Sequence, residues 1–238
     1  MSVATAIRTR DATALPGKRD EDWRWTDLRG LIRQTPAPSA PYAGEPPPGP
    51  FAGLVPDAET VANGAGAVRI VVGPGEERMV ALRFLSQGDG SHVAEAAITV
   101  EAGGRLVLLE SYEGEGGYLS QTGLSFRVRT GGSLERIIIA DDPAEAVSVS
   151  QAEVRLAPGA HFGQTSLTSG ARRQRIETRV HHPGGHGDLR LDGVYLLGGQ
   201  RHADLTSVVT HEGLDGTTSQ LAKGVVRDQA RGVFQGRI

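Results

Sequence analysis

The chain has 238 residues, with 25 basic and 28 acidic side chains and a formal net charge of −3. This near balance excludes an overall field that would draw the protein to nucleic acid or to an anionic membrane. Disulfides and thiol chemistry are excluded because there is no cysteine. No signal-peptide-like run opens the chain, and no stretch approaches the ~18 apolar residues of a membrane span. We therefore expect a soluble, cytoplasmic protein.

Residues 1–34 predict an N-terminal helical region. The acidic run Asp20–Asp22 is suited to a helix start, where negative charge favours the helix dipole. The residues that would then share one helix face are Trp25, Leu28 and Ile32. We expect the two tryptophans of this region to anchor it to the rest of the chain, because large aromatics mostly supply buried area. A partner site is the alternative.

Residues 35–56 predict a linker. They hold eight of the thirteen prolines, including three in a row at 46–48. Such a composition favours extended, polyproline-like backbone that acts as a stiff spacer. A ligand for a proline-binding module is the less favoured interpretation.

Residues 57–238 predict a β-helix domain, because apolar slots recur at a fixed step of 28 residues. The first slot is filled by Ile70, Ile98, Phe126 and Val154. The second, two residues later, is filled by Val72, Val100, Val128 and Leu156. Each copy then reaches a glycine, at Gly75, Gly103, Gly131 and Gly159. Glycine accepts the backbone angles of a sharp corner, so each copy reads as a strand followed by a turn.

The repeat predicts a mainly β fold, a right-handed parallel β-helix whose coils stack about 4.8 Å apart. The next copy comes 26 residues later, two fewer than the repeat, and is filled by Val180, His182 and Gly185. The copy after it returns to the 28-residue step and is filled by Val208, Thr210 and Gly213. A further coil would open near Phe234 and stop at Ile238. The stretch 79–85 is ambiguous between helix and strand.

Five histidines are weak candidates for a metal site: His181, His182, His186, His202 and His211. Imidazoles bind zinc and iron, but no zinc-protease spacing occurs. The strand register also points neighbouring histidines to opposite faces. We therefore favour ordinary core and surface histidines and assign no metal. A basic run, Arg172, Arg173, Arg175 and Arg179, favours a solvated strand face over RNA binding.

Acidic residues leave a second function open, that of a carbohydrate-active, pectate-lyase-like β-helix enzyme. Its general acid or metal ligands would be Asp188 and Asp192, since Asp141 and Asp142 precede a proline and favour a turn. Exported glycan enzymes usually carry a signal peptide and many aromatics, whereas here aromatics are 5%. No phosphate-binding loop, dinucleotide fingerprint or nucleophile elbow occurs. The residues alone therefore favour a non-enzymatic binding or scaffold protein.

Both ends of the chain carry motifs that resemble a known family. The C-terminal ones are Gly199–Asp204, His211, Thr217–Val225 and Asp228–Ile238, and the N-terminal one is Arg19–Leu28. Together they resemble the SufB/SufD family of the Suf iron–sulfur cluster assembly machinery, and the N-terminal motif is similar to that of SufD. The resemblance implies a helical N-terminal region, a central right-handed parallel β-helix and a C-terminal helical region. It also implies a complex with SufB and with the ATPase SufC.

Two departures from the family affect what the resemblance implies. The chain ends before the C-terminal helices that dock SufC, so it is either a fragment or a shortened member. It also lacks cysteine, the main ligand of Fe–S clusters, so a cluster would be bound chiefly by a partner and only transiently in the complex. This favours an accessory scaffold of the SufD kind with no cofactor of its own.

The resemblance and the unfinished coil together predict a partner interface at the C-terminal end. In the family, SufB and SufD pair through the ends of their β-helices, and an unfinished coil exposes unpaired backbone groups that another chain can satisfy. We expect a heterodimer or homodimer through the strands at 225–238. The expected contact residues are Lys223, Asp228, Phe234 and Gly236.

Overall fold

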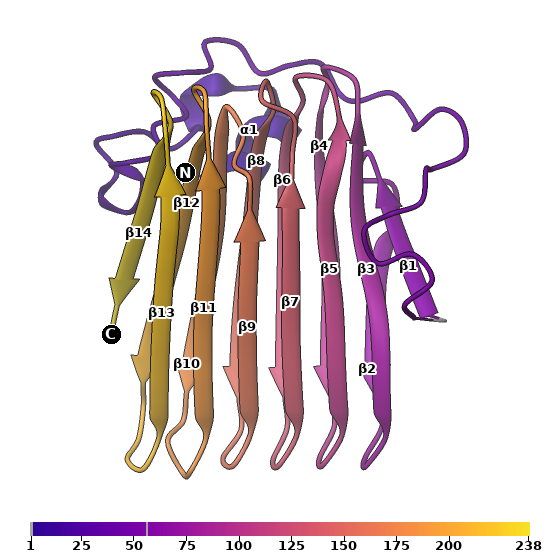
Figure 1. The fold of residues 1–238 in the computed structure, drawn as a ribbon, viewed down its shortest axis with the longest axis vertical. Helices are drawn as coiled ribbons and strands as arrows, with labels where there is room; N and C mark the ends of the chain where they lie inside the picture. The colour runs from indigo at the N-terminus through magenta and orange to yellow at the C-terminus, as the bar shows by residue number, and fades with distance from the viewer. Residues whose placement is uncertain (1, 56) are drawn as a thin grey trace.

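The computed structural model describes residues 2–55 and 57–238, and its dominant feature is a parallel β-solenoid of about six coils (Figure 1). Each coil contributes one strand to each of two seven-stranded parallel sheets, which lie face to face. Sheet B contains β1 (Asp57–Ala62), β3 (Glu77–Gln87), β5 (Arg105–Glu115), β7 (Ser133–Asp141), β9 (His161–Thr168), β11 (Asp188–Leu197) and β13 (Thr217–Val226). Sheet A contains β2 (Ala67–Val72), β4 (Ser91–Val100), β6 (Leu119–Val128), β8 (Val147–Leu156), β10 (Arg173–His182), β12 (His202–His211) and β14 (Arg231–Arg237). The predicted fold class is confirmed, and the ambiguous stretch 79–85 belongs to strand β3.

The 28-residue repeat is confirmed by the strand register. Ile70 pairs with Ile98, which pairs with Phe126 and through it with Val154 in the next coil. All four side chains point between the two sheets and are buried. The shorter step to Val180 is also confirmed, since Val154 and Val180 are paired. The stacked apolar rows therefore form the core, because each coil can bury its inner face only against its neighbours.

The predicted register is wrong by one residue in the next coil. Val180 pairs with Val209, and His182 pairs with His211, so the step is one residue longer than the repeat predicts. Val209 is buried, whereas Val208 points outward. Because side chains alternate across a strand, a slip of one residue exchanges the inner and outer faces. The corner between β10 and β11, residues 183–187, is one residue longer than the preceding lower corner at 157–160 and accommodates the extra residue.

The lower corners of the solenoid, where sheet A strands turn into sheet B strands, explain the recurring glycines (Figure 1). Gly75, Gly103, Gly131 and Gly159 all adopt a positive φ between 66° and 69°. L-residues with a Cβ rarely adopt this region, so a side chain there would strain the turn. In the next lower corner the predicted Gly185 also has a positive φ of 59°, beside His186 at 63°. In the last one the positive φ falls on Asp215 and not on the predicted Gly213.

The helix expected from residue 20 onward is wrong. Helical structure in the first 34 residues consists of α1 (Val3–Thr9) and two single 3-10 turns, η1 (Ala12–Ala14) and η2 (Glu21–Trp23). Local side-chain bonds hold the backbone in turns instead: Asp20 accepts a bond from the Gly17 amide, and Asp27 accepts one from the Gly30 amide. No helix in the described part of the chain is long and apolar enough to cross a membrane.

The N-terminal segment covers the outer face of sheet A instead of standing apart from it. Trp23 and Leu28 are buried in an apolar cluster with Leu119 of β6 and Val147 of β8. The anchoring role predicted for Trp23 is therefore confirmed, whereas Trp25 remains 44% exposed. Leu28, whose spacing predicted that it lies on one face of a helix, instead packs against sheet A.

The segment 35–55 is attached to the upper end of the first coils. The amide of Ser39 donates to the carbonyl of Ser91 at 2.9 Å, and the Ser91 amide donates to the carbonyl of Ala37 at 2.7 Å. His92 lies beneath this contact, with Nδ1 3.0 Å from the Ser39 hydroxyl and Nε2 3.1 Å from the Ser86 hydroxyl. Met1 and Pro56, which fall at predicted region boundaries, lie outside the described residues.

Acidification is expected to destabilise the protein through His92. Burial lowers the pKa of His92 from 6.5 to about 4, so the unfolded chain binds the proton more readily than the folded one. Stability should be fully present above pH 6.5 and should fall by about 3 kcal/mol as the pH drops to 4. Urea unfolding at several pH values measures this slope.

The variant His92→Gln should flatten that slope, while His181→Gln, a change at a half-buried outer-face histidine, should leave it as in the wild type. An unchanged slope in the His92 variant would assign the acid sensitivity to other groups.

Candidate functional site

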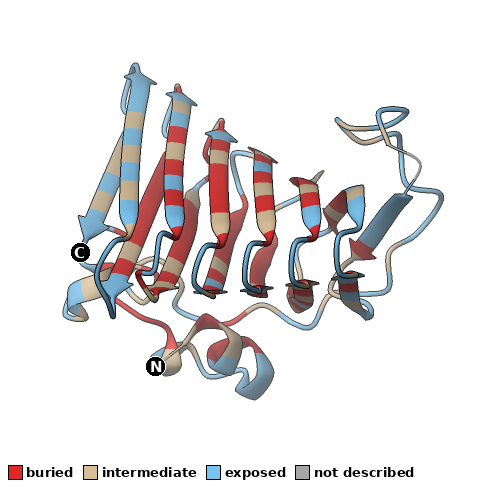
Figure 2. Cartoon of the chain, turned by 90° about the horizontal axis from the view of Figure 1, so that it is seen from below, coloured by how far each residue is buried: buried red, intermediate tan, exposed pale blue. Residues whose placement is uncertain are grey.

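The C-terminal end of the solenoid is open in the described residues. Strand β13 pairs only with β11, and β14 pairs only with β12, so each carries one unpaired edge. Figure 2 shows both strands largely exposed, whereas the preceding coils are banded with buried residues. We call β13 and β14, with the corner between them, the open end.

Apolar side chains at the open end are left uncovered. Phe234 occupies the same inner column as Leu205 of the preceding coil, and Leu205 pairs with Ile176. Leu205 is 7% exposed, but Phe234 is 48% exposed because no described coil covers it. Leu221, Val225, Val226 and Ile238 are exposed as well. Phe234 and Val226 lie in inner columns, and Leu221 and Val225 lie on the outer face of sheet B. Exposed apolar residues gathered at one end of a fold are typical of an interaction surface.

The four predicted contact residues are distributed over the open end. Phe234 and Gly236 lie on β14, and Lys223 is exposed on β13. Asp228 lies in the corner between the strands with φ 61°, and its carboxylate accepts a bond from the Gly199 amide at 2.9 Å. Asp228 therefore has a structural role in the corner. Phe234 lies in the inner column, whereas Lys223 is paired with the exposed Val194 and lies on the outer face of sheet B.

A polar group at the open end, which forms the mouth of the solenoid, lacks a hydrogen-bond partner. Gln220 of β13 and Phe234 of β14 line a cavity of about 30 Å³, which we call the mouth cavity. The Oε1 atom of Gln220 accepts a bond from Ser207 at 2.9 Å, but its buried Nε2 has no hydrogen-bond partner. An unsatisfied buried donor is costly, so the mouth presents a group that another chain could satisfy.

A buried ion pair lies deeper inside the solenoid and was not predicted. Arg136 donates through Nε to Glu110 at 2.8 Å and through Nη2 at 2.6 Å, and both side chains are fully buried. Burial alone would lower the pKa of Arg136, yet the adjoining carboxylate holds it above its ordinary value. The alternation of Leu134 and Ile138 around Arg136 could have placed it inward, since a strand repeats every two residues.

This ion pair continues as a row of polar side chains toward the open end. The hydroxyl of Tyr112 donates to Glu110 at 2.6 Å, and burial together with that carboxylate raises the pKa of Tyr112. Arg136 also donates to Gln164 at 2.9 Å, and Thr178 donates to the same amide oxygen at 3.0 Å. Gln164 and Thr178 in turn line the mouth cavity. The row is satisfied internally and offers no exposed nucleophile.

The five histidines are mostly separated. His182 and His211 face the interior and stack with ring centroids 4.8 Å apart, whereas His181 lies on the outer face, as predicted. His186 lies in a corner, and His202 is 3.1 Å from the carbonyl of Trp25. The described ranges contain no group of three or more His, Asp or Glu side chains arranged to hold a metal ion.

The acidic residues considered for glycan chemistry have structural partners. Asp188 accepts bonds from Thr217 and lies 2.9 Å from His161, and these contacts keep its pKa low, against the effect of burial. A carboxyl group with a low pKa keeps its charge and is poorly suited to act as a general acid. Asp192 is paired with Arg190 at 3.6 Å.

The Asp141–Asp142 pair lies at the end of β7 and the start of the following corner, as predicted. Asp141 accepts a bond from Ser169 at 2.6 Å. Asp142 is buried and accepts a bond from Tyr118 at 2.7 Å, and burial raises its pKa. Both carboxylates therefore hold neighbouring coils together.

The basic run is only partly the solvated face that was predicted. Arg175 is fully buried, with Nη1 2.6 Å from Asp204, Nη2 2.8 Å from Glu177 and its guanidinium 4.5 Å from the ring centre of Trp23. The prediction failed because the N-terminal segment covers this part of sheet A. Asp204 also accepts a bond from Thr26 at 2.5 Å, so a buried network joins the two ends of the chain.

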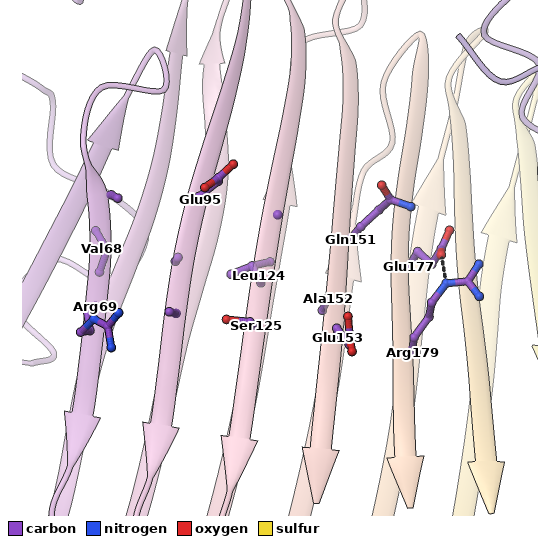
Figure 3. A pocket seen from close by; sticks show the side chains of 14 residues that line it. Val68, Arg69, Glu95, Leu124, Ser125, Gln151, Ala152, Glu153, Glu177 and Arg179 are labelled. Carbon is purple, nitrogen blue, oxygen red and sulfur yellow. Dashed lines mark hydrogen bonds and ion pairs between the residues drawn. The ribbon is translucent and has the colours of Figure 1, made fainter. Parts of the chain in front are cut away.

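A surface groove of about 670 Å³ crosses the uncovered part of sheet A (Figure 3). Its floor is made by small residues such as Gly123 and Ser125. At its rim, Glu177 and Arg179 are paired with each other at 2.6 Å, and Glu95 is paired with Arg8. These three rim charges are thus neutralised within the chain, whereas Arg69, which also lines the groove, forms no ion pair with a described residue. Because most of its charges are paired, the groove is a weaker candidate site than the open end.

Comparison with known proteins identifies the family. Residues 84–238 match the family described as "SUF system FeS cluster assembly, SufBD core domain", which is more than half of the chain. The chain therefore belongs to the SufBD family and is a component of the SUF Fe–S cluster assembly system, whose SufBD members are generally non-catalytic assembly subunits. No curated protein and no solved structure matches it.

Proposed function

From its membership of the SufBD family, we propose that this chain is a non-catalytic scaffold subunit of the SufD kind. It pairs with a SufB-like subunit through the open end and works with a SufC-like ATPase in the cytoplasm. The observation that carries the proposal is the open end itself, where two unpaired strand edges, exposed apolar side chains and the unsatisfied Gln220 amide coincide. A strand from a partner would satisfy all three at once.

The assignment to the SufD kind rests on two features. The chain has no cysteine, so thiolate ligands for the cluster, which is the cargo of the complex, come from a partner. The SufD-like motif around Trp23 is joined to sheet A by the contact between the Trp23 ring and the Arg175 guanidinium.

The proposal also includes a division of the chain into an N-terminal region at 1–34, a linker at 35–56 and a β-helix domain at 57–238.

The edge of β14 can be tested with one backbone position. The amide of Arg231 points to β12, where it donates to the Arg201 carbonyl at 2.8 Å. Strand alternation then directs the amide of Gly236 to the unpaired side. Gly236→Pro should remove that donor, keep the ladder with β12, and weaken binding to a SufB-like subunit at least tenfold, since a lost donor costs about 1–3 kcal/mol.

The matched control is Gly236→Ala, which keeps the amide and brings its Cβ only to 3.3 Å from the Gln220 side chain. It should bind as the wild type does in size-exclusion chromatography with light scattering and in a titration. Equal binding by the proline and alanine variants would place the interface elsewhere. If the wild type associates with neither SufB-like nor SufC-like subunits, the proposed function is wrong.

A further inference from the structure

Five arginines gather at the upper end of the solenoid, where sheet B strands turn into sheet A strands. They are Arg24 of the N-terminal segment, Arg172 and Arg173 at the start of β10, Arg201 before β12, and Arg231 at the start of β14. We call these five residues the arginine cluster. Across residues 2–55 and 57–238, none of the five forms an ion pair with a carboxylate, although most other arginines of the β-helix do.

The strand register stacks part of this charge in one column. His202 pairs with Arg231, and Gln174 pairs with Ala203, so Arg173, His202 and Arg231 occupy equivalent positions in three successive coils. Adjacent strands lie about 4.8 Å apart, so Arg173 and Arg231 are two strand spacings apart, with His202 between them. Burial, followed by the charges of Arg172 and Arg231, lowers the pKa of Arg173, and the Asp27 carboxylate opposes part of this effect. Positive charge therefore outweighs negative charge around Arg173.

The backbone and one indole ring hold these guanidinium groups in place without neutralising them. Arg201 donates to the carbonyls of Asp142 at 2.9 Å and Gly170 at 2.6 Å. The guanidinium groups of Arg24 and Arg231 lie 5.1 and 5.4 Å from the ring centre of Trp25. Both contacts leave the full positive charge of each guanidinium group available to a ligand.

Two further observations indicate an incomplete site. A cavity of about 510 Å³ opens beside the cluster and is lined by Leu31, Ala144, Glu145, Arg172, Arg173, Gln200 and Arg201. His202, at the back of the column, is 2% exposed, and its Nδ1 atom is buried with no hydrogen-bond partner. The only carboxylate that lines the cavity is Glu145.

We propose that the arginine cluster and this cavity form a binding site for a small, multiply charged phosphate compound. Three arginines of the cluster, Arg172, Arg173 and Arg201, line this one cavity, and Arg24 and Arg231 add positive charge beside it at Trp25. Several arginines match the several oxygens of a polyphosphate or phosphate ester, which arginine binds in bidentate geometry. A single carboxylate would compensate only part of the charge. The site shares Arg231 of β14 with the open end, whereas the arginines that line its cavity, Arg172, Arg173 and Arg201, lie outside the open end. The proposal does not depend on the function proposed above.

The test is a titration of the wild-type protein with inorganic pyrophosphate and, separately, with ADP, followed by calorimetry and by thermal unfolding. Wild-type protein should bind pyrophosphate and unfold at a higher temperature when it is bound. If ADP binds more tightly than pyrophosphate, the site recognises a nucleotide. If the two bind equally, the site recognises only the phosphate groups.

The variant Arg173→Gln/Arg231→Gln should weaken pyrophosphate binding at least tenfold and abolish the thermal shift. Its matched control is Arg127→Gln/Arg129→Gln, which removes the same charge from exposed positions of β6 and its lower corner and should bind as the wild type does. Without ligand, the cluster variant should unfold no earlier than the control, because like-charge repulsion is relieved.

The single exposed change Arg172→Gln provides a second measurement that does not depend on the folding of the double variant, and it should weaken binding several-fold. Two results would overturn the proposal: no binding of either ligand by the wild type at millimolar concentration, or equal weakening by the cluster and control variants.

Discussion

Replacement of Arg136 by leucine is expected to lower the free energy of unfolding by about 3–5 kcal/mol. The change leaves the fully buried Glu110 carboxylate without the guanidinium that binds both of its oxygens. Water cannot reach the charge, so its desolvation is no longer compensated. Urea unfolding of the pure protein measures this loss.

Two further variants separate the ion pair from side-chain size. Arg127→Leu, an exposed change on β6, should alter stability by less than about 0.5 kcal/mol. The double variant Glu110→Leu/Arg136→Leu should recover most of the loss, since apolar replacements of a buried pair are often neutral. Its polar neighbours stay partnered, because Thr178 still donates to Gln164 and Ser150 still contacts Tyr112. A double variant as unstable as the single one would mean that packing, and not charge, decides the effect.

Replacement of Arg175 by leucine is expected to cost a similar amount, about 3–5 kcal/mol, and also to release the N-terminal segment from sheet A. Arg175 lies between Asp204 and Glu177 and close to the Trp23 ring. Its removal leaves the buried Asp204 carboxylate without an ion-pair partner, while Glu177 keeps its pair with Arg179. Tryptophan fluorescence measures the release directly, because the only tryptophans are Trp23 and Trp25. Trp25 is already half exposed, so a red shift of the emission would report mainly on Trp23.

The matched control is Arg69→Leu, at an exposed position of β2 far from the N-terminal segment. It should leave both the emission and the free energy of unfolding near the wild-type values. A destabilised Arg175 variant with unchanged emission would show that the segment is held by its apolar contacts to β6 and β8 alone.

The repeat was predictable because it is a local property of the sequence. Each coil repeats the same alternation, so Ile98, Phe126 and Val154 could be placed in one column from spacing alone. The longer corner between β10 and β11 was not predictable in this way. A corner can absorb one extra residue without any change of composition, and this shifted the column from Val208 to Val209.

The candidate site was predictable only in part. Phe234 and Gly236 follow from the position of the last strand, and the structure places both at the open end. The unsatisfied Gln220 amide and the arginine cluster could not be found from sequence, since each depends on which coil lies beside it. Arg173 and Arg231 are 58 positions apart, yet two strand pairings bring them to one column.

The sequence by itself determined the solenoid fold, the glycines at its corners and the residues that line its core. The reason is that both patterns are local in the sequence: a buried residue recurs at every second position of a strand, and the same corner recurs every 28 residues. Only the tertiary structure decided the path of the first 34 residues. Their apolar spacing suits a helix and a sheet-covering segment equally well, and the choice came from the buried network of Arg175, Asp204 and Thr26. Pairing between distant charges depends on the completed fold, since neither partner is near the other until the coils have stacked.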